Sequence, residues 1–229
     1  MALFTISDVH LSLSTDKSMD VFSGWTDYVS RIENNWKAVV SDDDSVVLPG
    51  DISWEMKIQN ATEDFGFINS LPGRKYIIKG NHDLWWTSMT KMNAFLRDNG
   101  FDTITILNNA AVRIGDVAVC GTRGWMIEES GTDSKLINRE AIRLRMSLEE
   151  GRKLGGEPIV FLHYPPVTFQ NECTELVSVL HEYDVKKVYY GHLHGDSAFR
   201  AFEGNRDGIE YQVVSCDRVG FTPVLVSRH

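Results

Sequence analysis

The chain has 229 residues, of which 42% are hydrophobic and 24% are charged, and this balance excludes a disordered or fibrous protein. Its formal net charge of −9, without a long basic run, disfavours long nucleic acid and anionic membranes as partners. Three widely spaced cysteines form no C-x-x-C pair, so we expect small buried side chains rather than disulfides or a zinc finger. The sequence begins without a charged leader and has no apolar run of about 18–20 residues, so we expect a cytoplasmic protein without a membrane span.

Short β-branched segments alternate with longer helical patterns over the first two thirds of the chain, which is the order of βαβ units. We expect strands at residues 3–7, 45–48, 75–78, 117–120, 159–163 and 187–190, and helices at 26–40, 56–70, 86–98, 134–153 and 172–183. After residue 191, short runs at 198–202, 209–214 and 223–226 predict antiparallel strands that complete a second sheet. No linker interrupts this order, so we expect residues 1–229 to form a single α/β domain.

One long irregular segment, residues 11–26, carries Phe22 and Trp25 among polar residues. Loops of this length inside a compact domain are more often functional than accidental, so the segment is a candidate active-site lid. A plain surface loop is the alternative.

Five short motifs share one arrangement: each follows a predicted strand and carries a side chain that can bind a metal ion. In chain order they are Asp8-Val9-His10, Gly50-Asp51, Gly80-Asn81-His82-Asp83, His163-Tyr164-Pro165-Pro166 and Gly191-His192-Leu193-His194. Each motif alone is common by chance, but all five in order are not. Because loops beyond the carboxyl ends of the strands converge on one crevice in an open α/β sheet, we expect the five motifs to meet there.

Together the motifs offer more metal donors than one ion can use. The donors are Asp8, His10, Asp51, Asn81, His163, His192 and His194. This number suits two ions that share a bridging carboxylate. A mixed nitrogen and oxygen set without thiolate favours Mn²⁺, Fe, Zn²⁺ or Co²⁺ over Ca²⁺ or Mg²⁺ alone.

The sequence resembles the calcineurin-like metallophosphoesterases, a family defined by D-x-H, G-D, G-N-H-(D/E), H and G-H-x-H in this order. All five motifs are present between residues 8 and 194. The resemblance implies a four-layer α/β/β/α sandwich. It also implies a first metal held by Asp8, His10, Asp51 and His194 and a second held by Asp51, Asn81, His163 and His192, with Asp51 bridging.

The same resemblance implies a reaction, the hydrolysis of a phosphate ester through in-line attack by a metal-bridging hydroxide. His82 would be the imidazole that faces the substrate and protonates the leaving oxygen, with Asp83 as its partner. Two divalent cations outweigh the charges of Asp8 and Asp51, so the crevice can attract a small phosphomonoester or phosphodiester despite the acidic surface.

The chain departs from the protein Ser/Thr phosphatases of this family. Those enzymes carry Asp-Arg-Gly shortly after Gly-Asp, whereas Ile52-Ser53-Trp54 follows Asp51 here, and they have glutamate in place of Asp83. The sequence is closer to bacterial phosphodiesterases and phosphohydrolases. Protein phosphatase activity and a non-catalytic metal-binding scaffold are the alternatives, although scaffolds of this fold typically lose the catalytic histidine or some ligands, and all are present here.

Three further residues are candidates for the substrate pocket. Trp54 and Trp85 follow the second and third motifs directly, and each either walls the crevice or packs in the core. Arg123 follows a predicted strand and either grips phosphate or is a solvated turn residue.

Overall fold

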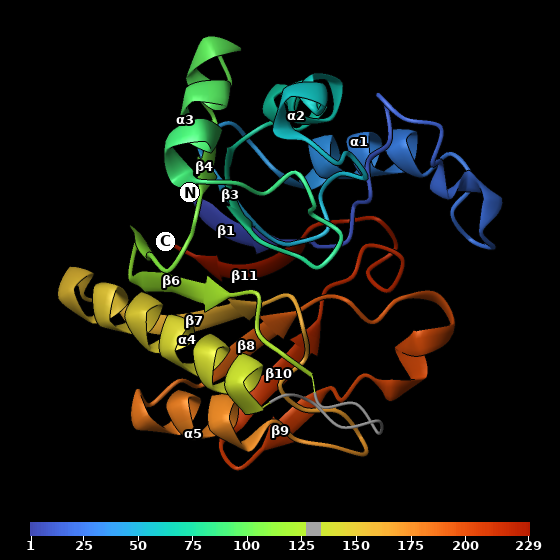
Figure 1. The fold of residues 1–229 in the computed structure, drawn as a ribbon. Helices are drawn as coiled ribbons and strands as arrows, with labels where there is room; N and C mark the ends of the chain where they lie inside the picture. The colour runs from blue at the N-terminus through green and yellow to red at the C-terminus, as the bar shows by residue number, and fades with distance from the viewer. Residues whose placement is uncertain (127–133) are drawn as a thin grey trace.

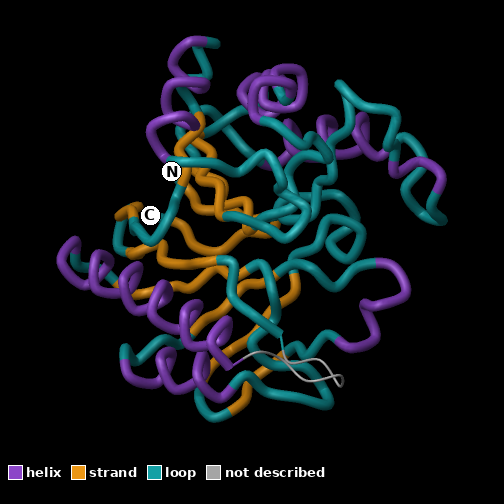
Figure 2. The backbone as a smooth tube through the Cα atoms, in the orientation of Figure 1, coloured by secondary structure: helices purple, strands orange, loops and turns teal. Residues whose placement is uncertain are grey.

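The structure is a computed structural model, and it describes residues 1–126 and 134–229. It contains four layers (Figure 1): helices α1, α2 and α3 cover one sheet, the second sheet packs beneath the first, and helices α4 and α5 cover its outer face. This arrangement confirms the predicted α/β/β/α sandwich. The tube in Figure 2 shows the strands in the middle of the molecule and the helices outside.

The first sheet has five strands in the order β11-β1-β2-β3-β4. These strands are β1 (Ala2–Thr5), β2 (Ser45–Pro49), β3 (Arg74–Ile78), β4 (Ile104–Ile106) and β11 (Val224–Arg228). Strands β1, β2, β3 and β4 each run parallel to their neighbours in this series, whereas β11 runs antiparallel to β1. The parallel strands therefore end at one edge of the sheet, and three of the five motifs follow them there.

The second sheet has six strands in the order β5-β6-β7-β8-β10-β9. These strands are β5 (Val112–Ile114), β6 (Val117–Thr122), β7 (Glu157–Leu162), β8 (Lys187–Tyr190), β9 (Gly204–Arg206) and β10 (Ile209–Val213). Its four central strands are parallel and its two edge strands are antiparallel.

The helices are amphipathic, as the sequence pattern predicts. They are α1 (Tyr28–Val39), α2 (Thr62–Ser70), α3 (Met89–Asp98), α4 (Ser134–Leu154) and α5 (Thr174–Glu182). The longest, α4, buries Ile137, Ala141, Leu144 and Leu148 at helical spacing, so one stripe faces the sheet. It ends where Gly155 adopts a φ of +73°, a conformation that glycine tolerates at a helix C-terminus. No described helix combines the length and the hydrophobicity that a membrane crossing requires.

A separate hydrophobic core lies between the two sheets. Leu3 and Val47 from the first sheet join Val119 and Phe161 from the second sheet in this core, and all four are fully buried. The burial of such side chains stabilises the fold by about 1.5–3 kcal/mol each. The contact fixes the two sheets relative to each other.

The late strands differ from the prediction. Residues 198–202 are not a strand, because Gly195–Arg200 form the 3-10 helix η3, which is closed by hydrogen bonds between His194 and Ser197. Strand β10 is parallel to β8, and β11 joins the first sheet rather than the second. Strands β4, β5 and β9 have three residues each, which is too short for a periodic pattern to predict.

The cysteines are free and buried, as expected from their spacing. Burial raises the pKa of the Cys120 thiol to about 12 and that of Cys173 to about 11, and it raises the pKa of Cys216 well above the ordinary value. In the unfolded chain these thiols ionise near pH 9, so above that pH the folded protein binds more protons than the unfolded protein.

The free energy of unfolding is therefore expected to fall as the pH rises from about 9 to 11, by up to about 1.4 kcal/mol per pH unit for each thiol. Urea unfolding at several pH values measures this slope. The free energy of unfolding of Cys120→Ala should fall less steeply with pH than that of the unmodified protein, because one thiol with a raised pKa is removed. Equal slopes would contradict the assignment.

Candidate metal centre

The five motifs come together at the seam between the two sheets. Asp8 and His10 follow β1, Asp51 follows β2, and the Asn81 segment follows β3, all in the first sheet. His163 follows β7, and His192 and His194 follow β8, both in the second sheet. Each sheet thus supplies donors to one site, as the carboxyl ends of parallel strands allow.

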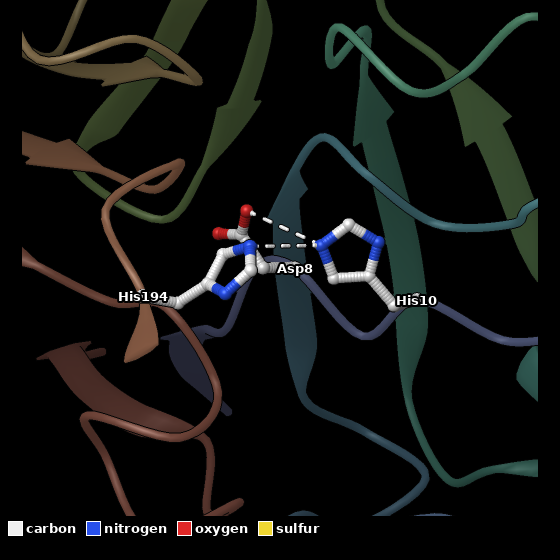
Figure 3. Close-up of side chains that lie close together, drawn as sticks. All are labelled: Asp8, His10 and His194. Atoms are coloured by element: carbon white, nitrogen blue, oxygen red, sulfur yellow. Dashed lines mark hydrogen bonds and ion pairs between the residues drawn. The ribbon is translucent and has the colours of Figure 1, made fainter. Parts of the chain in front are cut away.

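The first cluster of donors consists of Asp8, His10 and His194, whose ligand atoms all lie within 4.8 Å of one another. Figure 3 shows the two imidazole rings and the carboxylate pointing toward one another. The Nε2 atoms of His10 and His194 are 3.2 Å apart, and the His10 Nε2 atom is 4.0 Å from Asp8 Oδ1. Two ring nitrogens and one carboxylate oxygen around a common point form a set that suits a transition-metal ion.

The second cluster consists of Asp51, His163 and His192, again with ligand atoms within 4.8 Å. Asn81 belongs beside it, because its Oδ1 atom is 2.6 Å from His163 Nε2. The other ring nitrogen, His163 Nδ1, is 3.0 Å from the Pro49 carbonyl oxygen. That carbonyl accepts a hydrogen bond from Nδ1–H, which leaves the lone pair of Nε2 facing the site.

Asp51 lies between the two clusters. Its Oδ1 atom accepts a hydrogen bond from the His82 backbone N–H at 2.8 Å. Its Oδ2 atom is buried and has no hydrogen-bond partner among the described residues, and it lies 3.7 Å from His10 Nε2 and 3.4 Å from His163 Nε2. An unsatisfied buried carboxylate oxygen is costly, and a divalent cation on either side would satisfy it. The residues present therefore fit two metal ions.

The protonation states also favour metal binding. Burial lowers the pKa of His163 and of His192 to about 3, and it lowers the pKa of His10 well below its usual value. These imidazoles are neutral near pH 7, so protons do not compete with a metal for their lone pairs. Burial and the neighbouring charges of Asp8 and Asp83 raise the pKa of Asp51, so its ionised form is costly. A bound cation would stabilise the ionised carboxylate.

Four of the candidate metal ligands have an uncommon backbone conformation, with a positive φ angle. Asp8, His10, Asp51 and His192 have φ values of +56°, +44°, +54° and +69°. Non-glycine residues in this left-handed region cost about 1–3 kcal/mol and cluster at functional sites. The conformation is held by main-chain hydrogen bonds from Asp8 N–H to the Gly50 carbonyl and from His10 N–H to the Asp51 carbonyl.

Gly80 lies in close contact with Asp51. A Cβ atom at this position would lie 2.1 Å from Asp51 Oδ1 and 2.3 Å from the Asp51 backbone nitrogen. We therefore expect Gly80→Ala to displace the carboxylate, to destabilise the protein by about 1–3 kcal/mol, and to weaken metal binding. Urea unfolding and metal analysis measure the two effects, and Gly66→Ala, where the added carbon meets only the Phe101 ring at 3.8 Å, controls for the loss of a glycine. Unchanged metal content in Gly80→Ala would contradict this geometry.

Asp83 differs from its expected role as the partner of the His82 ring. Its carboxylate is fully buried and accepts four hydrogen bonds, from the backbone N–H groups of Asp51, Ile52 and Gly80 and from the Trp85 indole. Through these four hydrogen bonds the carboxylate connects the loop after β2 to the loop after β3. Asp83 is thus a positioning residue behind the site.

His82 lies at the edge of a pocket of about 470 Å³ that also includes His10 and His194. Its ring is half-buried, and burial lowers its pKa although Asp8 nearby opposes this effect. The Trp54 ring lies 4.5 Å from the His82 ring and stacks on His10 at 4.9 Å. Trp54 therefore walls the crevice, as one of the two sequence interpretations has it.

The other two candidates lie elsewhere. Trp85 is 1% exposed, packs 5.0 Å from the Phe65 ring, and belongs to the core behind the third motif. Arg123 lines a separate pocket of about 170 Å³ with Lys79 and Arg143. Its carbonyl oxygen accepts hydrogen bonds from the backbone of His163 and the next residue, so Arg123 supports the fourth motif through its main chain.

Sequence reasoning did not assign the remaining pocket walls to individual residues. Met19, Phe22 and Trp25 line the pocket beside the histidines, and all three belong to the segment 11–26. Their signal was the aromatic content of a long loop directly after the first motif. The segment therefore forms a wall of the crevice.

Comparisons with known proteins concern the family and the fold. The family model of calcineurin-like phosphoesterases matches residues 1–196. No curated protein shows significant similarity to the chain. Among solved structures, a protein of unknown function from Aquifex aeolicus has 16% identity and a TM-score of 0.52, covering 98% of this chain and 95% of that one. Phosphopantetheinyl hydrolase from Mycobacterium tuberculosis has 12% identity and a TM-score of 0.57, covering 100% and 96%.

A third similar structure is that of the protein TT1561 from Thermus thermophilus, with 10% identity and a TM-score of 0.58 over 98% of this chain and 97% of that one. At these identities the likeness concerns the fold. The match of the family model extends over all five motifs, and the chain belongs to the calcineurin-like phosphoesterase family.

Proposed function

We propose that this phosphoesterase uses two divalent cations to hydrolyse a small phosphomonoester or phosphodiester. The observation that carries the proposal is the position of Asp51 Oδ2, which is buried between His10 Nε2 and His163 Nε2 and accepts no hydrogen bond from the part of the chain that the structure describes. In this position one carboxylate reaches both donor clusters. Asp8, His10 and His194 would hold one ion, and Asn81, His163 and His192 would complete the second, with Asp51 shared.

The residues of the chain have distinct roles in this reaction. When bound, two divalent cations supply Lewis acidity toward the phosphoryl oxygens and lower the pKa of a water nucleophile. His82 belongs to neither donor cluster, and its half-buried ring at the pocket edge can protonate the leaving oxygen. Asp83 fixes the loops that carry Asp51 and His82. Trp54 limits the motion of the His10 ring by stacking on it and that of the His82 ring by a tilted contact.

Several properties of the chain fit small substrates inside the cell. The formal net charge of −9 repels long nucleic acid, whereas a pocket of about 470 Å³ is in the range of small-molecule sites. Three free buried thiols suit a reducing compartment such as the cytoplasm. Mn²⁺, Fe and Zn²⁺ are the metals that this nitrogen and oxygen donor set favours.

Turnover of 4-nitrophenyl phosphate and of bis(4-nitrophenyl) phosphate, with and without added Mn²⁺, tests the proposal. Preparations of Asp51→Asn, which lacks the shared carboxylate, serve as the blank. We expect metal-dependent release of 4-nitrophenol by the unmodified protein only. No turnover with any divalent metal would overturn the proposal, and retained metal without turnover would favour a scaffold. Release of phosphate from phosphopeptides alone would favour a protein phosphatase.

A further inference from the structure

The pocket beside the first donor cluster has walls of a distinctive chemistry. Its lining includes three imidazoles and four large apolar or aromatic side chains beside a few small and polar residues; the large ones are His10, His82, His194, Met19, Phe22, Trp25 and Trp54. Two indoles, one phenyl ring and one thioether around about 470 Å³ form a wide apolar space next to the reacting centre. Sites with such walls bind flat apolar groups.

The position of His82 indicates which side of the scissile bond this pocket serves. His82 is the histidine of the pocket that belongs to neither donor cluster, and under the proposed function it gives its proton to the leaving oxygen. His163 and His192, the histidines of the second cluster, are not among the described residues of the pocket wall. A group attached to the leaving oxygen would therefore extend into this pocket.

Charged groups of both signs lie at or near the pocket. Asp196 lines it at η3, and the Lys17 Nζ atom lies 5.6 Å from the centroid of the Trp54 ring. The apolar and aromatic walls, rather than these charges, therefore select the occupant, because an aromatic group would remove their surface from water.

One wall residue presents a ring that a ligand would cover. Phe22 is 55% exposed although its backbone is fixed by a hydrogen bond from its N–H to the Met19 carbonyl. A flat ligand that packs on Phe22 would remove this ring from water.

We infer that this pocket is the leaving-group subsite and that it selects aromatic leaving groups, such as aryl or nucleoside groups. The inference rests on the proposed function for the role of His82. Phe22 and Trp54 are the residues that determine this specificity. Phe22 is the better test, because Trp54 stacks on the candidate ligand His10 and its replacement would disturb the metal site.

Two diesters with the same leaving group test the assignment. Bis(4-nitrophenyl) phosphate and methyl 4-nitrophenyl phosphate both release 4-nitrophenol but differ in the group that stays on phosphorus. Phe22→Ala should lower kcat/KM about five- to tenfold on both diesters, mainly through KM, because one aromatic contact is lost. Phe169→Ala, which removes a phenyl group that is 65% exposed outside the pocket, should change neither. A loss confined to the bis ester, or no loss at all, would overturn the inference.

Indole NMR signals give a readout that does not depend on turnover. We would titrate the full chain, with and without Zn²⁺, with 4-nitrobenzyl alcohol, and use n-propanol as the probe without a ring. The Trp54 and Trp25 indole signals, assigned with Trp54→Phe and Trp25→Phe, should shift with the aromatic alcohol only, and more weakly in Phe22→Ala. The indole signal of Trp36, whose Nε1–H donates a hydrogen bond to the Pro72 carbonyl, should keep its chemical shift.

The two experiments separate failure of the inference from failure of the proposed function. Indole shifts with the aromatic alcohol but no turnover with any metal would overturn the proposed function and support the aromatic character of the pocket. Metal-dependent turnover without shifts of Trp25 and Trp54 would support the proposed function and overturn the inference. Equal shifts with n-propanol would also overturn it.

Discussion

Replacement of Asp51 by asparagine is expected to remove metal from both donor clusters. The Oδ2 atom of Asp51 faces His10 and His163 at the same time, so loss of its charge weakens two sites through one substitution. We expect the affinity for each ion to fall more than about tenfold and kcat/KM to fall about a thousandfold or more. Metal analysis after gel filtration, together with turnover of 4-nitrophenyl phosphate, measures both effects.

Asp44→Asn is the matched control for Asp51→Asn. Asp44 is another buried aspartate, but it lies at the amino end of β2, where it accepts hydrogen bonds from Ala2 and Ser41. This variant makes the same chemical change far from the donors and should retain its metal. If Asp51→Asn keeps two ions per chain, the bridging role of Asp51 is wrong.

Replacement of His82 by alanine is expected to have the opposite pattern, with metal retained and rate lost. His82 supplies no atom to either donor cluster, so the metal content should equal that of the unmodified protein. The loss of a proton donor at the leaving oxygen typically lowers the rate by roughly a hundred- to ten-thousandfold. The loss should be smaller for esters of acidic phenols, which leave without protonation, than for alkyl esters.

His181→Ala provides the matched control, because His181 is an exposed histidine in the last turn of α5. Its kinetics should be unchanged. If His82→Ala loses metal together with activity, then His82 supports the metal site and its role as a proton donor is not needed to explain the rate.

The sequence was sufficient for the fold class and for the grouping of donors, because both depend on local patterns. Short β-branched segments followed by glycine, histidine and acidic residues mark the carboxyl ends of parallel strands, and those ends must converge. Both donor clusters contain only residues from the five motifs. The resemblance added the division into two sets, and the described donors form two clusters of three residues each.

Other features depend on tertiary contacts that no local pattern contains. Asp83 was expected to contact His82, which precedes it, but four donors from the loops after β2 and β3 occupy its carboxylate. Trp85 and Trp54 are both tryptophans that follow a motif, yet one is in the core and the other walls the pocket. Strand β11 returns to pair with β1 at the start of the chain, and such distant pairing is not visible in residue spacing.

Each donor cluster draws on both sheets: His194 comes from the second sheet to meet Asp8 and His10, and Asp51 comes from the first to meet His163 and His192. A metal ion in either cluster would therefore act as a cross-link between the two halves of the sandwich. Binding that occurs only in the folded state stabilises a protein by an amount that grows with the free concentration of ligand. The resistance of this enzyme to heat and proteolysis should thus follow the supply of metal in its surroundings, which couples its lifetime to the same ions that its chemistry requires.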